Sequence, residues 1–197
     1  MRVRSHRMQR PDRVEAAMRA CPRERFLPPA RRASAHLDAP LAIGYEQTNS
    51  QPRTVLAMLR LLDVRPGLSV LDVGSGSGWT AAILGELVGP SGSVLGVERI
   101  PQLVAAARDA LALDPRPWVH VERAEAGVLG APDRAPFDRV LVSAEPAALP
   151  DALVEQLRPG GVMVIPVAGE MLRVVRGSGG TTVTRHGRYR FVPLVED

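Results

Sequence analysis

The sequence predicts an α/β fold with a mostly parallel sheet that finishes with antiparallel strands. From residue 68, short apolar runs alternate with helical segments, which is typical of βαβ units. A glycine-rich turn directly follows the first of these runs and leads into a helix. After residue 170, apolar runs are separated only by tight turns, so the last strands should be antiparallel.

The N-terminal part is expected to form a cover of helices and loops. Residues 11–20 begin with Pro and an early acid and then place apolar side chains at helical spacing. Residues 21–45 contain four prolines and show no sustained period, which predicts loops and short turns. A second helix is expected at residues 54–62.

The core should contain the alternating elements. Parallel strands are expected at residues 69–73, 93–97, 118–121, 138–142 and 162–166, with helices at 80–88, 102–113 and 150–157. Antiparallel strands are expected at 171–176, 181–185 and 188–192, with turns at 177–180 and 186–187. A chain of 197 residues supports one sizeable core, so we expect one domain, with residues 1–62 as the cover and 63–197 as the sheet.

The basic residues gather at the N-terminus. The formal net charge is +4, all 25 basic residues are arginines, and ten of them lie in the first 32 residues. Such a stretch could contact nucleic acid or an acidic surface. No recognition motif or interleaved aromatic side chains accompany the charge, which favours a solvated arm and helix face.

Composition excludes several other classes of protein. Cys21 is the single cysteine, so an intrachain disulfide is impossible, and the four histidines show no ligand spacing, so no metal site is expected. No apolar run reaches the ~18 residues that span a bilayer, and the start lacks the apolar stretch of a signal peptide. We expect a cytoplasmic protein, and a monomer is favoured.

The sequence V-L-D-V-G-S-G-S-G-W at residues 70–79 predicts a cofactor loop. Glycine lets a backbone adopt positive φ, so a ligand could lie against amides at the helix N-terminus. A dinucleotide fingerprint requires its last glycine where Trp79 stands. The pattern, preceded by Asp72 on the strand, resembles the loop of class I S-adenosylmethionine-dependent methyltransferases.

Glu98 strengthens that interpretation. It ends the next strand, 24 residues beyond Gly74, where a carboxylate can accept hydrogen bonds from both hydroxyls of an adenosyl ribose. The alternative is a surface glutamate paired with Arg99. The carboxyl end of a strand is the usual ligand side of such sheets, which favours the cofactor role.

Further blocks resemble the protein-L-isoaspartate (D-aspartate) O-methyltransferases over nearly the whole chain. They are P-R-E-R-F-L-P at 22–28, D-A-P-L-A-I-G-Y-E-Q-T-N-S-Q-P at 38–52, G-V-E-R-I at 96–100, A-P-F-D at 135–138, Q-L-R-P-G-G at 156–161 and R-F-V-P-L at 190–194. The resemblance implies a doubly wound, seven-stranded Rossmann-like sheet. It also implies S-adenosylmethionine as methyl donor and an isoaspartyl or D-aspartyl carboxylate of a damaged protein as acceptor.

The resemblance also implies roles for individual residues. The cofactor would contact Asp72, Gly74, Ser75, Gly76, Gly78, Glu98, Arg99, Glu125 and Ala126. Thr48 and Ser50 would act at the methyl group and the acceptor, with Gln47 and Asn49 binding the substrate. An acceptor carboxylate is ionised at pH 7 and needs no general base, so hydroxyls would position it. Ser50 could also cap the helix that follows it.

Three positions depart from the family pattern. Glu46 stands where a glycine is usual, and Asn49 replaces an apolar residue. Glu46 would repel an acceptor carboxylate unless an arginine such as Arg53 pairs with it or its side chain points to solvent. Ala126 replaces the acid that reads the adenine amino group, and Glu125 is the neighbouring candidate to replace it.

These departures leave three functions open. The first is isoaspartyl repair methylation. The second is methylation of a normal aspartate in a peptide natural product, suggested by Glu46 and Asn49. The third is a non-catalytic relative that kept the fold, suggested by Ala126. Methyl transfer to matched peptides separates the first two, and S-adenosylmethionine binding separates the third.

Overall fold

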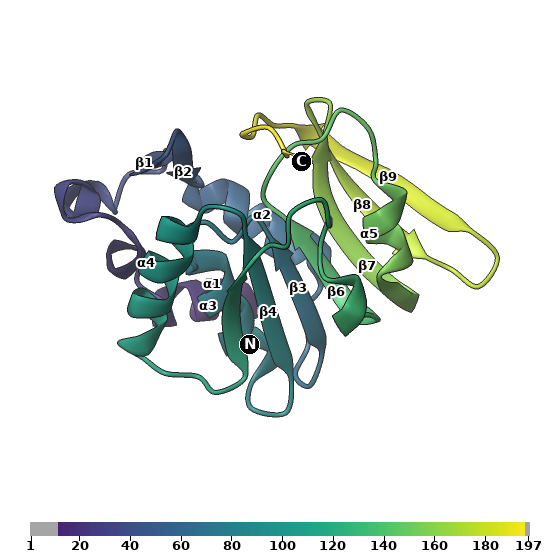
Figure 1. Ribbon diagram of the computed structural model, residues 1–197, viewed down its shortest axis with the longest axis horizontal. Helices are drawn as coiled ribbons and strands as arrows, with labels where there is room; N and C mark the ends of the chain where they lie inside the picture. The colour runs from purple at the N-terminus through teal and green to yellow at the C-terminus, as the bar shows by residue number, and fades with distance from the viewer. Residues whose placement is uncertain (1–11, 196–197) are drawn as a thin grey trace, which may run out of the picture.

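The computed structural model describes residues 12–195, and a seven-stranded sheet in the order β5-β4-β3-β6-β7-β8-β9 forms its centre (Figure 1). The strands are β3 (Ser69–Val73), β4 (Ser93–Glu98), β5 (Val119–Arg123), β6 (Phe137–Val142), β7 (Leu157–Val167), β8 (Glu170–Arg176) and β9 (Thr181–Arg188). Strands β3 to β7 pair in parallel, whereas β8 and β9 are antiparallel to their neighbours. The predicted α/β class with an antiparallel end is confirmed.

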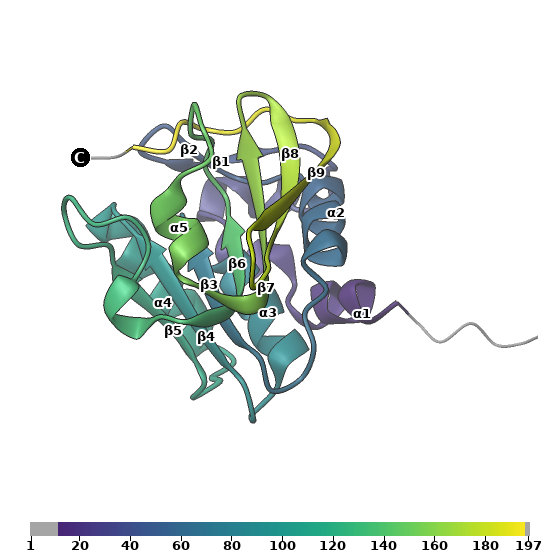
Figure 2. The same ribbon diagram turned by 90° about the vertical axis from the view of Figure 1, so that its right-hand side faces the viewer.

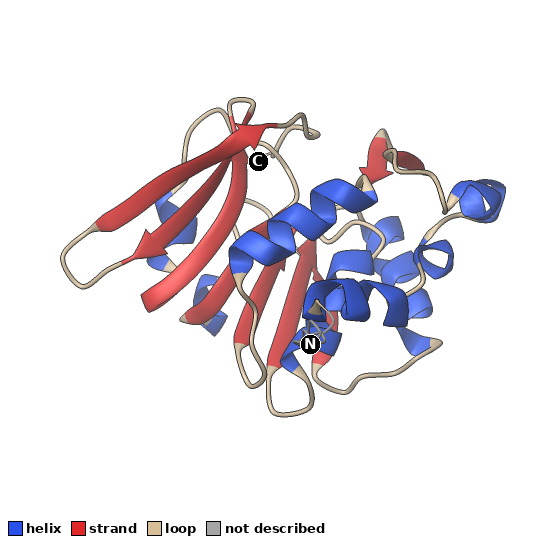
Figure 3. Ribbon diagram, turned by 180° about the vertical axis from the view of Figure 1, so that it is seen from behind, coloured by secondary structure: helices blue, strands red, loops and turns tan. Residues whose placement is uncertain are grey.

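Helices cover both faces of this sheet. They are α1 (Arg13–Ala20), α2 (Pro52–Leu62), α3 (Trp79–Val88), α4 (Pro101–Ala112) and α5 (Asp151–Glu155). Figure 2 shows α1 and α2 on one side of the strands and α5 on the other, and Figure 3 shows α2 lying across the sheet from behind. One buried cluster contains residues of α1 to α4, and a second contains Leu153 of α5. The doubly wound arrangement is therefore confirmed.

Burial explains the apolar runs of the central strands. All but one residue of β3 is buried, as are all but one of β6. Because helices cover both faces, side chains on both sides of these strands are mostly apolar, with Asp72 in β3 and Asp138 in β6 as buried exceptions. Helix α2 instead has one buried face, formed by Val55, Met58, Leu59 and Leu62, as expected for an amphipathic helix.

The expectation of loops alone at residues 21–45 was incomplete. Two 3₁₀ helices, Arg23–Phe26 and Pro29–Ser34, are followed by a hairpin of β1 (Leu41–Gly44) and β2 (Gln47–Asn49). Its two-residue turn is Tyr45 and Glu46, both with positive φ. The usual sequence signal for such a turn is Asn-Gly or Asp-Gly, which is missing here.

The predicted strand at residues 188–192 was wrong. Strand β9 continues through the expected turn at 186–187 to Arg188, and its pairing with β8 contains a register shift where Gly187 has a φ of 92°. An extra residue in a bulge lets a strand continue past a glycine. The chain then leaves the sheet, and Pro193 forms an isolated bridge with Glu145.

Other boundaries differ by a few residues. Helix α5 ends at Glu155, and β7 begins at Leu157 rather than at 162, with a register shift against β6 near its start. Predictions on residues 1–11, including four of the N-terminal arginines, lie outside the described residues. Within residues 12–195, no helix is long and apolar enough to cross a membrane.

Candidate cofactor and acceptor site

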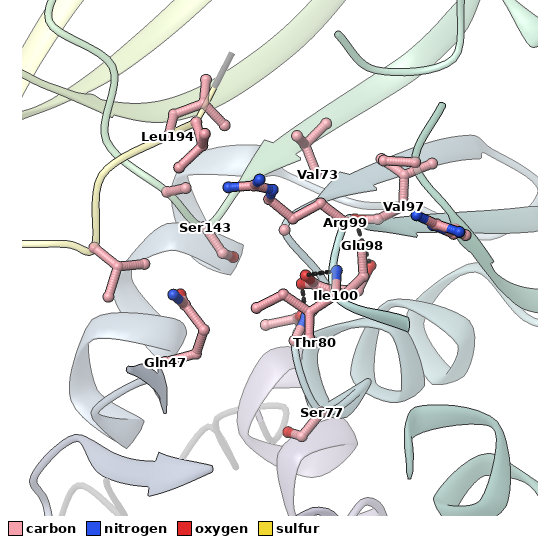
Figure 4. A pocket seen from close by; sticks show the side chains of 18 of the residues that line it. Gln47, Val73, Ser77, Thr80, Val97, Glu98, Arg99, Ile100, Ser143 and Leu194 are labelled. Atoms are coloured by element: carbon pink, nitrogen blue, oxygen red, sulfur yellow. Dashed lines mark hydrogen bonds between the residues drawn. The ribbon is translucent and has the colours of Figure 1, made fainter. Parts of the chain in front are cut away.

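A cavity of about 390 Å³ lies at the carboxyl ends of the parallel strands (Figure 4). Its walls come from strand β2, the glycine loop after β3, the end of β4, the loop after β5, residues 143–144 after β6, and the C-terminal segment 192–195. This edge is the usual ligand side of a doubly wound sheet. Its volume falls within the range of about 300–1,000 Å³ typical of small-molecule sites.

The glycine loop adopts backbone conformations that favour glycine. Gly74, Gly76 and Gly78 all have positive φ, at 75°, 53° and 83°. The amides of Gly74 and Ser75 donate to the carbonyl of Val97, and that of Gly78 donates to the carbonyl of Ser75. Most loop amides are therefore already bonded within the protein, contrary to the expectation that they would face a ligand. Such a loop suits a ligand without a diphosphate better than one with it.

Gly74, Ser75 and Gly76 line the cavity, whereas Gly78 and Asp72 do not. Gly78 precedes helix α3, and a Cβ atom there would lie 2.9 Å from the Cβ of Ala107 in α4. Its glycine therefore permits close packing of the loop against α4. Asp72 lies beneath the loop, where its role toward a cofactor stays a prediction.

Asp72 is fully buried and incompletely bonded. Its Oδ2 accepts a hydrogen bond of 2.7 Å from the hydroxyl of Thr80, which does line the cavity. Among the described residues its Oδ1 has no hydrogen-bond partner. Burial raises the pKa of Asp72 to about 7, with the Thr80 hydrogen bond acting to lower it and the charge of Glu98 acting to raise it.

Glu98 lies in the wall of the cavity with its carboxylate held by the backbone. It is 6% exposed, and its two oxygens accept 2.9 Å hydrogen bonds from the amides of Gly76 and Ile100 (Figure 4). A carboxylate has about four lone-pair sites, so two remain for a ligand. The side chain bridges the glycine loop and the start of α4, unlike the surface glutamate of the alternative interpretation.

The loop after β5 closes the other end of the cavity. Glu125 and Ala126 are exposed and line it, as does the exposed Arg99 after β4. Sequence reasoning missed Gln156, which holds this loop: its Oε1 accepts from the amide of Ala131 and its Nε2 donates to the carbonyl of Leu129. Gln156 lies in the Q-L-R-P-G-G block at 156–161, but that block does not show which loop its side chain contacts.

The predicted acceptor residues meet this cavity from the β1–β2 hairpin. Gln47, Thr48, Asn49 and Ser50 all line it, and the labelled Gln47 and Ser143 lie on the same side of the view in Figure 4. Sequence reasoning also missed Ser143, which follows β6. Polar side chains from two distant segments therefore border one space.

Two expectations around Ser50 and Glu46 need correction. Gln51, not Ser50, is the N-cap of α2, and Asp38 accepts the hydrogen bond from the helix amide of Arg53. Arg53 also forms an ion pair with Asp38 rather than with Glu46. Glu46 is exposed and lies outside the cavity lining, so its side chain is not part of the predicted acceptor site.

Arg23 was also missed, because it was counted among the solvated N-terminal arginines. It is 5% exposed, and its guanidinium lies 5.4 Å from the centre of the Trp79 ring. Its position within the P-R-E-R-F-L-P block was the available signal. Within residues 12–195, no group of three or more metal-ligating side chains is close enough to hold a metal ion.

Comparison with known proteins agrees with this geometry. The family model for protein-L-isoaspartate(D-aspartate) O-methyltransferases matches residues 1–197. The protein-L-isoaspartate O-methyltransferase of Methanopyrus kandleri is 43% identical over 98% of this chain and 88% of its own length. That of Methanothrix thermoacetophila is 46% identical over 93% of this chain and 88% of its own.

A solved structure shares the fold. The crystal structure of a protein-L-isoaspartate O-methyltransferase described as putative, from Plasmodium falciparum in complex with S-adenosyl-L-homocysteine, superposes with a TM-score of 0.82. The alignment covers 94% of this chain and 91% of that one at 24% identity.

Proposed function

The chain belongs to the protein-L-isoaspartate(D-aspartate) O-methyltransferase family, and we propose that its cavity holds S-adenosylmethionine beside the carboxylate of an isoaspartyl or D-aspartyl residue. The enzyme is an S-adenosylmethionine-dependent carboxyl O-methyltransferase that acts on damaged proteins or peptides. The observation that carries the site assignment is the buried carboxylate of Glu98 beside the glycine loop. We further propose that the N-terminal cover and the sheet act as one domain.

The residues present fit the cofactor. Glu98 offers two unused acceptor sites to a ribose diol, and the loop after β5 offers Glu125 and the backbone around Ala126 to the adenine. Thr80, Ser75 and the glycine loop would border the amino-acid part. Asp72 would act from beneath the loop, through Thr80. When bound, the cofactor supplies a methyl group on a positively charged sulfur.

The reaction requires the protein's own residues to position the acceptor rather than to transfer a proton. An acceptor carboxylate has an ordinary pKa of about 4, so it is ionised at pH 7 and no side chain must remove a proton. Thr48 and Ser50 would orient its oxygens, with Gln47 holding the neighbouring peptide. The tail residues 192–195 form a wall that would limit water.

The departures from the family pattern leave this proposal intact at the acceptor end. Glu46 is exposed and does not line the cavity, and both ends of the Asn49 amide are bonded to protein. The two substitutions that suggested a retargeted acceptor therefore do not add a new group for substrate. Ala126 removes an acid from the exposed adenine end, where Glu125 remains.

The test is methyl transfer from labelled S-adenosylmethionine to matched peptides that differ only in one isoaspartyl or aspartyl linkage. We expect label in the isoaspartyl peptide and none above background in the aspartyl one. Equal transfer to both would favour the retargeted enzyme. Calorimetry with S-adenosylhomocysteine separates the third function, because a non-catalytic relative that lost the cofactor would show no binding.

A further inference from the structure

We propose that Asn49 is a positioning residue that joins the acceptor-side strand β2 to the glycine loop, with Arg23 holding its amide in place. The inference rests on the proposed function. It assigns to Asn49 a role that acts through other residues rather than through contact with the substrate.

The orientation of the Asn49 amide follows from its partners. Its Oδ1 accepts a 2.7 Å hydrogen bond from Nε of Arg23, and its Nδ2 donates a 3.0 Å bond to Oγ of Ser77. A guanidinium can only donate, so the oxygen must face Arg23 and the NH₂ group must face Ser77. All three side chains are buried. A substrate contact by Asn49 would have to compete with one of these bonds.

Arg23 ties the chain around Asn49 into one unit. Its terminal nitrogens donate to the carbonyls of residues on both sides of the hairpin: Leu37, Ala39, Asn49 and Ser50. These bonds at 2.8–3.0 Å satisfy a guanidinium whose burial lowers its pKa. The face of Trp79 adds a cation–π contact. Arg23 therefore joins residues 37–39 to residues 49–50 across the base of the hairpin.

The single side-chain link from this unit to the glycine loop in the described hydrogen bonds is the one between Asn49 and Ser77. Thr48 and Ser50 are the immediate neighbours of Asn49, and Ser77 lies between Gly76 and Gly78, seen below Thr80 in Figure 4. This bond directly links the strand that carries the acceptor hydroxyls to the cofactor loop. Ile43 adds an apolar contact, since its Cδ1 lies 3.3 Å from where a Cβ of Gly76 would stand.

A double-mutant cycle tests the coupling. Ser77→Ala and Asn49→Leu should each lower kcat/KM for an isoaspartyl peptide by about tenfold, and the double variant should lose no more than either alone. The decrease should appear in kcat rather than as an increase in KM, because misaligned hydroxyls still bind the peptide. Asn49→Asp should restore most activity, since a carboxylate accepts from both Arg23 and the Ser77 hydroxyl.

A binding measurement gives a readout apart from turnover. S-adenosylhomocysteine should strengthen calorimetric binding of the peptide to the wild-type protein by about fivefold or more, and Ser77→Ala should abolish that increase. The matched control is Ser93→Ala, whose hydroxyl bonds that of Ser69 at the opposite ends of the strands. It should leave both the rate and the cooperativity unchanged.

The outcomes separate the inference from the function it rests on. Absence of methyl transfer by the wild-type protein overturns the proposed function. An active wild type in which the two losses multiply to about a hundredfold overturns the coupling. So does a variant pattern in which Asn49→Leu raises KM while Ser77→Ala has no effect, because that pattern marks a direct substrate ligand. If Asn49→Leu does not fold, Ser77→Ala and Asn49→Asp still decide the matter.

Discussion

The carboxylate of Glu98 is held by two backbone amides, which fixes its remaining lone pairs toward the cavity. Glu98→Gln would replace one acceptor oxygen with an NH₂ group. We expect the affinity for S-adenosylhomocysteine to fall by about 10- to 100-fold, as for loss of a hydrogen bond to a charged group. Calorimetry measures it, with Glu86→Gln on the exposed side of α3 as a control that should bind normally.

A second ligand distinguishes the ribose contact from damage to the loop. The wild-type protein should bind a 2′-deoxyribose analogue of S-adenosylhomocysteine more weakly than the parent, and Glu98→Gln should lose that preference. If the variant still discriminates between the two ligands, the ribose is bound by another residue.

Asp72 predicts a dependence of stability on pH. Its pKa is raised from 3.8 to about 7, mainly by burial. Between these values the folded protein holds a proton that the unfolded chain has released, so this group makes the free energy of unfolding fall as pH rises. Asp72→Asn removes the titration. Urea unfolding without ligand gives the free energy of unfolding of both proteins. Between pH 4 and about pH 7, the free energy of unfolding of the variant should rise relative to that of the wild type.

A constant difference between the two proteins across that pH range would contradict the raised pKa. The sequence placed Asp72 on its strand beside the cofactor loop, but could not show its burial. That burial depends on how closely the loop and α3 pack over it, which only the three-dimensional structure reveals.

At the scale of elements, local sequence signals located the regular parts of the fold. The apolar strands β3, β4 and β6 and the helices α3 and α4 were predicted to within a few residues, because buried strands form apolar runs and the helices place apolar side chains at helical spacing. The β1–β2 hairpin was missed for the opposite reason. It has only two strands, and its turn residues are not those that such turns prefer.

Site residues that lie close to one another in the sequence pattern were predicted, whereas several of those that come from distant segments were not. The glycine loop and Glu98 belong to adjacent strands and followed from spacing. Arg23, Gln156 and Ser143 reach the cavity region from distant segments, and their contacts depend on tertiary structure. The N-cap of α2 shows the same limit, because its amide is bonded by Asp38 from another segment.

The hairpin turn offers a prediction about stability. Glu46 has a φ of 59°, a left-handed conformation that disfavours residues with a Cβ. Glu46→Gly should therefore raise the free energy of unfolding by about 1 kcal/mol, since glycine adopts this conformation without strain. Glu46→Ala removes the same charge but keeps the Cβ, so it should show no such gain. Chemical denaturation measures both variants.

Methyl transfer by Glu46→Gly should remain at the wild-type level, because the side chain lies outside the cavity lining. A change in KM for the acceptor peptide would show that the charge of Glu46 acts on the substrate after all. An equal gain in Glu46→Ala would point to charge rather than backbone conformation.

At the scale of the whole molecule, the cavity is formed by segments that are far apart in the chain. Its walls include the hairpin before α2 and the tail 192–195, with the parallel strands between them. The tail is not part of the sheet. It crosses the carboxyl edge and is held by backbone hydrogen bonds between Glu145 and both Val192 and Leu194.

Glu145 also binds the tail through its side chain. Its Oε1 accepts a 2.7 Å hydrogen bond from the amide of Gly169 in the β7–β8 turn, and its Oε2 accepts a 3.0 Å bond from the amide of Phe191. The carboxylate of Glu145 therefore joins the β7–β8 turn to the tail. The backbone of Glu145 joins the tail to the segment that follows β6. We expect Glu145→Ala to loosen the tail while the sheet stays folded, because no strand pairing depends on this side chain.

Hydrogen exchange measures that loosening. Loss of two bonds to a charged acceptor should speed exchange in the segment 191–194 by about 10-fold or more, with the amides of β6 and β7 unaffected. The control is Glu170→Ala, whose carboxylate pairs with Arg185 on the surface and does not touch the tail. Since the tail forms a wall of the cavity, kcat/KM for the isoaspartyl peptide should fall in Glu145→Ala and stay unchanged in Glu170→Ala. Faster exchange with full activity would mean that the wall can open without cost to the reaction, and unchanged exchange would mean that the backbone bonds alone hold the tail.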